Sequence, residues 1–190
     1  RQEARILDLE LSEERNRKEI KLLKESHDGT GQRFSLLRRD VNSQEQYSRR
    51  NSLRFFGIPE VEGVPSEDVI VDLVNTSLGV HLQKGDIDHI QRVNSAIKPG
   101  PKGPSTIIVK FLSFKKRNEV LGSRRKLAGT RKSIQEDLTR DNAKLLKMTR
   151  DHQRVKAAWT RDGRVIALLP ATDGKEMKKT IFSEADLARL

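Results

Sequence analysis

The sequence predicts an α+β protein in which a long N-terminal helix, forming a parallel coiled coil, precedes a ferredoxin-like module and a small α+β domain. Three observations predict this class. A heptad repeat runs through residues 1–50, short strands and helices alternate over 51–137, and one helix followed by hairpin signals occupies 138–190. We therefore expect three domains with these boundaries.

The composition favours several small domains over one large core. Of the 190 residues, 34% are apolar, 4% are aromatic and 34% are charged, too few apolar groups for a single core of this length. The absence of cysteine excludes disulfides and thiolate metal sites. No apolar run approaches the ~20 residues of a membrane span, and no signal peptide is evident. Because Arg1 stands where an initiator Met would, we expect native residues before it to be missing.

The positive charge is concentrated in one short stretch. The formal net charge is +11, and residues 110–132 hold nine basic side chains against the single acidic Glu119. A cluster of this kind favours a polyanionic partner, because each neutralised phosphate releases bound counterions. The alternative is a merely solvated basic surface.

Residues 1–50 have the pattern of a coiled coil. With Ile6 at heptad position a, apolar pairs at a and d alternate with polar pairs such as Glu13 and Asn16, and this register holds through six heptads. Gly29 and Gly31 cost about 2 kcal/mol of helix propensity, so we expect a locally distorted or fraying helix there. A single amphipathic helix packed on its own domain is the alternative.

The first heptad predicts a three-stranded coil. Arg5 at position g and Glu10 at position e flank the a/d pair of Ile6 and Leu9, a pattern associated with parallel trimers in which the Arg reaches a Glu of the neighbouring helix. We expect a homotrimer, with a dimer as the alternative. The expected interface residues are Arg5, Ile6, Leu9, Glu10, Ile20, Leu23, Phe34, Leu37 and Val41.

From Ser52 onward the periodicity changes to that of a small α+β domain. We expect a strand at 53–59, a helix at 66–78 capped by Ser66 and Gly79, a strand at 87–93, a stronger strand at 106–111, a basic helix at 114–127 and a weak strand at 133–136. The order β-α-β-β-α-β is that of the ferredoxin-like fold and of RNA-recognition modules.

Two stretches resemble a known protein family. The run from Glu45 to Arg54, Glu-Gln-Tyr-Ser-Arg-Arg-Asn-Ser-Leu-Arg, followed by Gly-Ile-Pro-Glu at 57–60, resembles the signature of the first open-reading-frame protein of LINE-type non-LTR retrotransposons, also described as transposase-22-like. Residues 107–111, Ile-Ile-Val-Lys-Phe, resemble the third strand of the same family. The layout of coiled coil, RNA-recognition module and small C-terminal domain is also similar.

This resemblance implies an RNA-binding homotrimer that coats its own transcript and acts as a nucleic-acid chaperone during target-primed reverse transcription. The implied partners are single-stranded RNA and DNA and further copies of the chain. The implied location is cytoplasmic ribonucleoprotein particles, with the nucleus as a further location. In the family, arginines of the C-terminal helix contribute to RNA binding; Arg150 lies nearest that position and Arg154 is its rival.

The sheet face of the expected module should bind bases poorly. Ordinary RNA-recognition modules stack bases on aromatic residues of the first and third strands. Here that face carries Arg54 and Phe56 on the first strand and Thr106, Ile108 and Lys110 on the third. Affinity must therefore come mainly from Lys and Arg, with little sequence preference. The alternate residues Phe55, Ile107, Val109 and Phe111 are expected in the core.

The C-terminal segment predicts a helix from about 140 to 158 with one apolar face. Its expected members are Leu145, Met148, His152, Val155 and Trp159. A hairpin should turn at Asp162 and Gly163, a strand should cover 177–182, and Ser183 should cap a last helix that we expect to be cut short at Leu190. We expect Trp159 to anchor the core; base stacking is the alternative.

Nothing in the sequence indicates catalysis. The four His residues lie on different elements without the spacing of metal ligands, and the Gly- and Pro-rich stretch 100–106 lacks the G-x-x-x-x-G-K-[ST] spacing of a phosphate loop. We expect no enzyme activity, no metal, no cofactor and no small-molecule substrate.

The expected nucleic-acid surface crosses both small domains through a cleft that closes as a short linker at 129–133 adjusts. One alternative function is an oligomerisation scaffold for acidic protein partners, and another is a domesticated or sequence-specific RNA regulator. The residues expected to bind nucleic acid are Arg49, Arg50, Arg54, Lys110, Lys115, Lys116, Arg124, Arg125, Lys126, Arg131, Lys132, Arg150 and Arg154.

Overall fold

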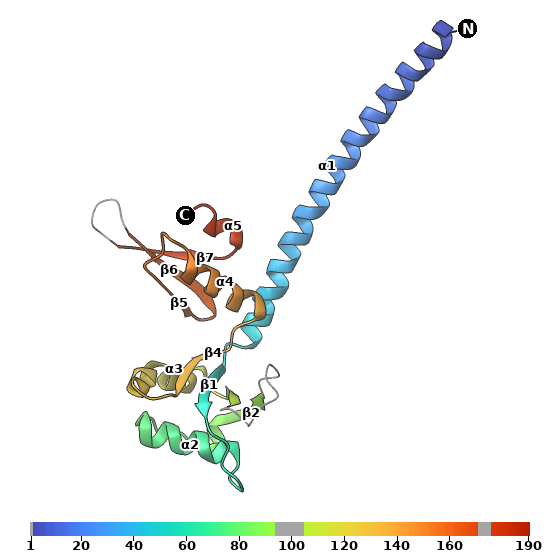
Figure 1. The fold of residues 1–190 in the computed structure, drawn as a ribbon. Helices are drawn as coiled ribbons and strands as arrows, with labels where there is room; N and C mark the ends of the chain where they lie inside the picture. The colour runs from blue at the N-terminus through green and yellow to red at the C-terminus, as the bar shows by residue number, and fades with distance from the viewer. Residues whose placement is uncertain (1, 94–104, 171–175) are drawn as a thin grey trace. The chain divides into compact units, whose positions relative to one another are not determined.

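The computed structural model describes residues 2–93, 105–170 and 176–190. The chain divides into two compact units, Arg1–Gln44 and Glu45–Leu190, and each is treated by itself. A long N-terminal helix and antiparallel sheets are both present (Figure 1), which confirms the expected α+β class. In the described part of the chain, no helix combines the length and the apolar character that crossing a membrane requires.

The N-terminal helix α1 (Gln2–Ser48) is continuous through the two glycines at which the sequence predicts distortion. Near them the Thr30 hydroxyl donates to the Ser26 carbonyl at 2.9 Å, and the Ser35 hydroxyl donates to the Gly31 carbonyl at 2.9 Å. Glycine lowers helix propensity but keeps its backbone N–H and C=O, so a long helix can include it without losing a hydrogen bond. The expected local distortion is therefore absent from this helix.

The second unit contains a four-stranded domain, residues 51–136, whose elements follow the predicted order. They are β1 (Ser52–Ile58), α2 (Ser66–Ser77), β2 (Ile87–Val93), β3 (Ser105–Phe111), α3 (Phe114–Gly122) and β4 (Ser133–Glu136), with short 3-10 helices η1 (Lys84–Asp86) and η2 (Ser123–Leu127). The strands form an antiparallel sheet in the order β2-β3-β1-β4. The basic helix expected over 114–127 thus ends at Gly122, where helix propensity is low, and continues as η2.

One face of this sheet forms the core of the four-stranded domain. Strand residues alternate between faces, and the four residues predicted for the core are at most 1% exposed: Phe55, Ile107, Val109 and Phe111. Both helices pack against them, α2 through Ile70, Leu73 and Val74 and α3 through Val120. In Figure 1 the two helices accordingly lie on the same side of the strands. The opposite face of the sheet points away from these helices.

The start of α2 differs from the sequence prediction. Ser66 is the first helical residue and Pro65 occupies the cap position, with no side-chain cap hydrogen bond. The Ser66 hydroxyl instead accepts from the Arg92 Nε of β2 at 3.2 Å. In the first turn of the helix, a hydrogen bond from Lys84 to the Asp68 carboxylate raises the pKa of this exposed ammonium above its ordinary value of 10.5.

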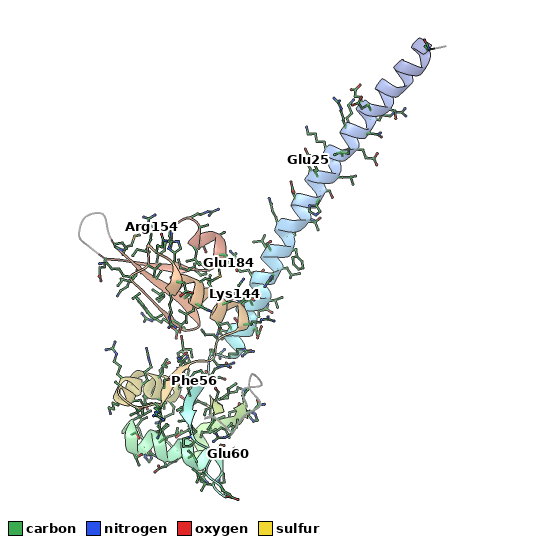
Figure 2. All side chains as sticks on the ribbon, viewed as in Figure 1. Glu25, Phe56, Glu60, Lys144, Arg154 and Glu184 are labelled. Atoms are coloured by element: carbon green, nitrogen blue, oxygen red, sulfur yellow. The ribbon has the colours of Figure 1, made fainter. Side chains whose placement is uncertain are left out.

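The remainder of the second unit is a three-stranded domain, residues 140–190. Its elements are α4 (Arg140–Asp151), β5 (Ala157–Arg161), β6 (Arg164–Leu169), β7 (Met177–Ile181) and α5 (Glu184–Leu187), and the antiparallel sheet has the order β5-β6-β7. As predicted, the Ser183 hydroxyl caps α5. An ion pair of 2.6 Å between Lys144 and Glu184 joins α4 to the start of α5 (Figure 2).

Helix α4 ends seven residues earlier than the predicted end at 158. His152 is its C-cap, in an extended conformation, and residues from 157 onward form β5. Val155 and Ala158 still pack against the same core as Leu145 of the helix. The apolar pattern that predicts the helix therefore extends beyond the residue at which the helix ends. Trp159, expected as a core anchor, is half-buried and does not belong to this core as described.

The hairpin between β5 and β6 turns where the sequence predicts it. Asp162 and Gly163 both have positive φ, 53° and 75°, the combination that a two-residue type I′ turn requires. A Cβ at Gly163 would lie 2.4 Å from the Cγ of Gln46. Glycine is therefore needed at this turn for its backbone conformation and for the close approach of a side chain from the end of α1.

Candidate nucleic-acid interface

The sheet face that points away from α2 and α3 has few groups on which a base could stack. Arg54 of β1 lies opposite Ile108 of β3, which in turn lies opposite Gln91 of β2. Phe56 is half-buried, and Lys110 forms an ion pair of 2.7 Å with the Asp88 carboxylate. The face therefore carries an arginine and an isoleucine in neighbouring positions on its two central strands. This arrangement favours contacts with phosphates over stacking of bases.

Two of the predicted RNA-binding arginines share a buried carboxylate. Asp137, 5% exposed, accepts from Arg54 Nε at 2.6 Å and from Arg49 Nη1 at 3.3 Å. Arg49 also contacts the Glu45 carboxylate at 2.7 Å. Arg49 therefore uses both of its terminal nitrogens within the protein and Arg54 uses its Nε, and each keeps about a third of its side chain exposed.

The third arginine of this segment is placed differently. The Arg50 guanidinium lies over the ring of Tyr47, 3.9 Å from its centroid, and both side chains are exposed. Such a cation–π contact orients the guanidinium without neutralising its charge. Arg50 can therefore present its charge to an anion more fully than Arg49 or Arg54.

The lysines of the basic segment fall into two groups. Lys126 donates to the carbonyl of Leu78 at 2.6 Å, at the end of α2, and Lys116 donates to the carbonyl of His81 at 2.9 Å and contacts Glu119. These two lysines tie α3 and η2 to the chain that follows α2. Lys115 is exposed on the first turn of α3. The charge available to a ligand is thus smaller than the count of lysines indicates.

Arg117, in the middle of the basic segment, belongs to the protein interior. It is 2% exposed and forms an ion pair of 2.6 Å with the Glu136 carboxylate, which is 5% exposed. Its Nη1 donates to the side chain of Asn118 at 2.8 Å, and its Nε is buried without a partner. This residue pairs the inner face of α3 with the end of β4 and does not reach the surface.

Arginines of the two domains meet at one groove. A cavity of about 150 Å³ is lined by α3, η2 and β4 on one side and by α4 and β5 on the other. Its lining includes Arg124 and Gln135 of the four-stranded domain and Arg150, Trp159 and Thr160 of the three-stranded domain. Arg124 donates to the Leu121 carbonyl at 2.9 Å. The volume is well below the roughly 300–1,000 Å³ of pockets that enclose a small molecule.

The structure places Arg150 and Arg154, the two candidate arginines of the C-terminal segment, in different surroundings. Arg150 occupies the last turn of α4, donates to the Ala158 carbonyl at 3.3 Å and lines the groove. Arg154 lies beyond the end of α4, because this helix is shorter than predicted, and is exposed (Figure 2). Arg150 is therefore the residue that faces the four-stranded domain.

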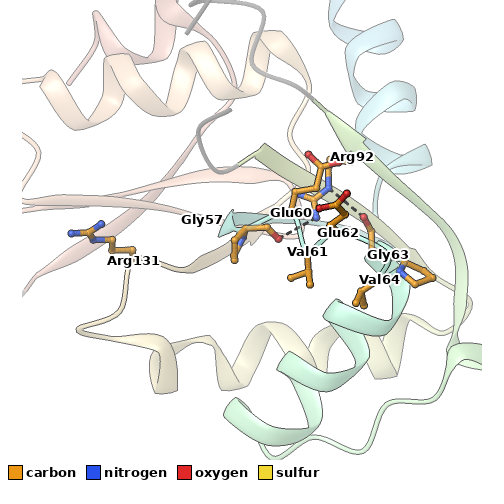
Figure 3. Close-up of a pocket in the computed structure, with 11 residues that line it drawn as sticks. Gly57, Glu60, Val61, Glu62, Gly63, Val64, Arg92 and Arg131 are labelled. Carbon is orange, nitrogen blue, oxygen red and sulfur yellow. Dashed lines mark hydrogen bonds between the residues drawn. The ribbon is translucent and has the colours of Figure 1, made fainter. Parts of the chain in front are cut away.

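The stretch predicted to be an interdomain linker, 129–133, lies inside the four-stranded domain. Arg131 and Lys132 immediately precede β4, and the Arg131 carbonyl packs against Gly57, where a Cβ would lie 2.1 Å from it. Arg131 also lines a cavity of about 1010 Å³ formed with residues 59–66 and Arg92. In Figure 3 its guanidinium points away from Arg92. The prediction that 129–133 links the two domains is wrong.

The true connection between the two domains is residues 137–139, and it is buried. Thr139 is 1% exposed, and its N–H donates to Gln46 Oε1 at 2.9 Å. The Asp137 carbonyl accepts from Gln46 Nε2 at 2.9 Å. A connection whose polar groups are satisfied by fixed partners does not favour the free closing motion expected from the sequence.

Sequence reasoning misses the residues that hold the two domains together. Gln46 occupies an outward heptad position, and nothing nearby in the sequence marks it as a contact. The buried Arg117, which links α3 to β4 within the four-stranded domain, is also missed but has a usable signal, because it lies three residues before the core residue Val120 and hence on the same face of α3. A prediction from charge alone would place Arg117 at the surface.

The comparisons with known proteins identify no family. The chain matches no protein-family model, and a search of curated proteins gives no match. Across the ranges that the structure describes, no three His, Asp or Glu side chains are grouped so that they could hold a metal ion.

The burial of Arg117 leads to a prediction that separates structural from surface arginines. Arg117→Ala should lower the free energy of unfolding by about 3–5 kcal/mol, because it leaves the Glu136 carboxylate buried without its cation. Arg124→Ala, at an exposed position of η2, should change it by no more than about 0.5 kcal/mol. Chemical denaturation followed by circular dichroism measures both. Equal, small effects would show that Arg117 is not the buried half of an ion pair.

Proposed function

We propose that this chain is a homotrimeric, largely sequence-independent single-stranded RNA- and DNA-binding protein, a nucleic-acid chaperone that packages the RNA of a LINE-type retrotransposon. The observation that carries the proposal is the groove at which Arg124 and Arg150 of two different domains line one cavity. A single-stranded backbone that follows this groove would have cations on both sides.

The arrangement of the four-stranded domain supports the proposal. Its strand order β2-β3-β1-β4, with both helices on one face, is the order expected of an RNA-recognition module. The other face carries Arg54, Lys110 and the half-buried Phe56. Arg54 and Lys110 are paired with the Asp137 and Asp88 carboxylates, and the face has little aromatic surface, which favours a module that reads few bases.

The same chemistry accounts for the expected tolerance of sequence. A phosphate is identical in every nucleotide, so cations that contact phosphates bind unrelated sequences about equally. Arg50 and Lys115, together with Arg124, Arg125 and Arg154, are exposed. These groups extend the positive surface beyond the groove without adding a pocket that would select one base.

Self-association follows from the apolar residues that α1 leaves in solvent. In the single chain Ile20, Leu23, Phe34, Leu37 and Val41, all at predicted a or d positions, are between 51% and 66% exposed. Apolar residues at this spacing are buried when helices form a coiled coil. The side chains of Arg5, Ile6, Leu9 and Glu10 lie outside what the structure describes, so three strands are proposed on the sequence pattern alone.

Chaperone activity would follow from many weak contacts on one particle. Three linked binding surfaces raise the effective concentration of each for a bound strand, while each phosphate contact can break and re-form separately. Neutralised phosphates also lower the repulsion between two strands that are about to pair. A protein of this kind would coat a transcript in cytoplasmic ribonucleoprotein particles and let strands rearrange.

The groove predicts how two substitutions change binding. Arg124→Ala with Arg150→Ala should weaken binding to unrelated single-stranded RNAs about equally, because both side chains are expected to contact phosphates. The salt dependence, measured as the slope of log K against log salt, should fall by roughly 0.7 for each phosphate that is no longer neutralised. Fluorescence anisotropy at several salt concentrations measures both quantities.

Lys156→Ala with Lys178→Ala is the matched control, because it removes the same charge from exposed positions of the three-stranded domain outside the groove. It should leave the affinity within about twofold, since distant surface charges are screened by salt. If the arginine variant bound one RNA normally and failed to bind another, the side chains would be reading bases. If it bound all RNAs normally, the groove would not be the binding site.

The heptad pattern predicts the mass of the assembly. Light scattering should give about three times the chain mass of 21.7 kDa. Removal of residues 1–44, the first unit, should leave monomers that bind RNA about a hundredfold or more weakly, because avidity is lost. A monomeric full-length chain would contradict the coiled coil, and a stable dimer would contradict the three-stranded interpretation of Arg5 and Glu10.

A further inference from the structure

The last turn of α1 belongs to the second unit, and its Gln46 side chain contacts the connection between the two domains and the three-stranded domain. Gln46 is 9% exposed. Its Nε2 donates to the Asp137 carbonyl at 2.9 Å, and its Oε1 accepts from the Thr139 N–H at 2.9 Å and from the Asn142 Nδ2 at 3.0 Å. One amide thus binds the connection between the domains and the first turn of α4.

The same side chain also contacts the hairpin turn of the three-stranded domain. The Cγ of Gln46 lies 2.4 Å from the position that a Cβ would occupy at residue 163. The Gly163 carbonyl accepts from the Asn142 Nδ2 at 2.9 Å, and the Gly163 N–H donates to the Glu136 carboxylate of β4 at 3.3 Å. These bonds run from the end of β4 to the turn between β5 and β6.

The contacts that join the two domains are thus polar and buried. The apolar core of the four-stranded domain and that of the three-stranded domain share no residue among those described. Hydrogen bonds are directional, so they fix an orientation more narrowly than apolar contact of the same area. Removing one partner leaves the others buried and without a hydrogen bond. The joined arrangement, in which these bonds hold the two domains together, is therefore sensitive to the loss of a single side chain.

We infer that Gln46 is a positioning residue for nucleic-acid binding: it holds the three-stranded domain in the orientation that brings Arg150 to the same groove as Arg124. This inference rests on the proposed function. Gln46 itself is not expected to contact the strand, because its polar atoms are engaged within the protein. Its role is to keep the binding-competent arrangement populated before RNA arrives.

Gln46→Ala in the full-length chain is the test, with anisotropy of an unstructured uridine-rich RNA at fixed salt as the readout. The apparent affinity should fall about tenfold, because most molecules then have their two domains separated and bind the strand without the contact from Arg150. Gln32→Ala is the matched control: the same substitution at an exposed position of the same helix. It should bind as the parent does.

A double-mutant cycle separates positioning from general damage. In the Gln46→Ala background, Arg150→Ala should cost much less than it costs in the parent, because strands bound to a separated arrangement do not use Arg150. Amide exchange over residues 137–142 should also quicken, since the Thr139 N–H loses its acceptor. If Gln46→Ala does not fold, Gln46→Met, which keeps the volume and removes the three hydrogen bonds, takes its place in the cycle.

Two outcomes would overturn the inference. One is that the Gln46→Ala variant binds RNA with the affinity of the parent. The other is that Gln46→Ala and Arg150→Ala lower the affinity by the same factors together as they do separately. A failure of the proposed function gives a different result. In that case Arg124→Ala and Arg150→Ala in the parent would leave RNA binding unchanged, whereas exchange at 137–142 would still respond to Gln46→Ala.

Discussion

The buried polar contacts of residues 136–139 decide how the second unit is assembled. With only 34% apolar residues, the chain forms two small cores, and neither extends into the other domain as described. Three sets of hydrogen bonds join them. The Glu136 carboxylate accepts from Gly163, and the Asp137 carboxylate accepts from Arg49 and Arg54. The backbone of 137–139 bonds to the Gln46 side chain. The groove lined by Arg124 and Arg150 lies between the two domains that these contacts join.

The internal contacts of the second unit divide its basic side chains into two classes. Arg117, Lys116 and Lys126 stabilise the four-stranded domain, and Arg49 and Arg54 bind a buried acid beside it. Arg50, Lys115, Arg124, Arg125 and Arg154 stay exposed, with Arg150 at the groove. The positive surface that the proposed function can use is therefore smaller than the net charge of +11 implies. Weak contacts on a small surface make the proposed avidity of a trimer the main source of affinity.

Local patterns are sufficient to predict most of the fold. The alternation of Phe55, Ile107, Val109 and Phe111, the turn at Asp162 and Gly163, and the cap at Ser183 each depend on neighbouring residues, and the structure has them as predicted. The predicted end of α4 is wrong because Val155 and Ala158 continue its apolar spacing from a different conformation. Apolar periodicity indicates which residues face the core, but it does not by itself indicate whether their backbone is helical or extended.

The candidate site is less predictable, because its partners are distant in sequence. Gln46 and Thr139 are 93 positions apart, and Arg49 and Asp137 are 88 apart. Composition identifies the cluster at 110–132 but cannot distinguish the buried Arg117 from the exposed Arg124. The linker expected at 129–133 is likewise misplaced, because the pairing of β4 with β1 keeps this stretch inside the four-stranded domain.

The central claim, that a single strand occupies the groove between the two domains, can be tested through Trp159. This residue lines the groove and is the only tryptophan of the chain, so its emission reports on that place alone. Titration of the full-length protein with an unstructured RNA should change the emission in step with binding measured by gel shift, with a midpoint that moves to higher RNA concentration as salt rises. An emission that stays constant while the gel shift shows saturated binding would contradict the account.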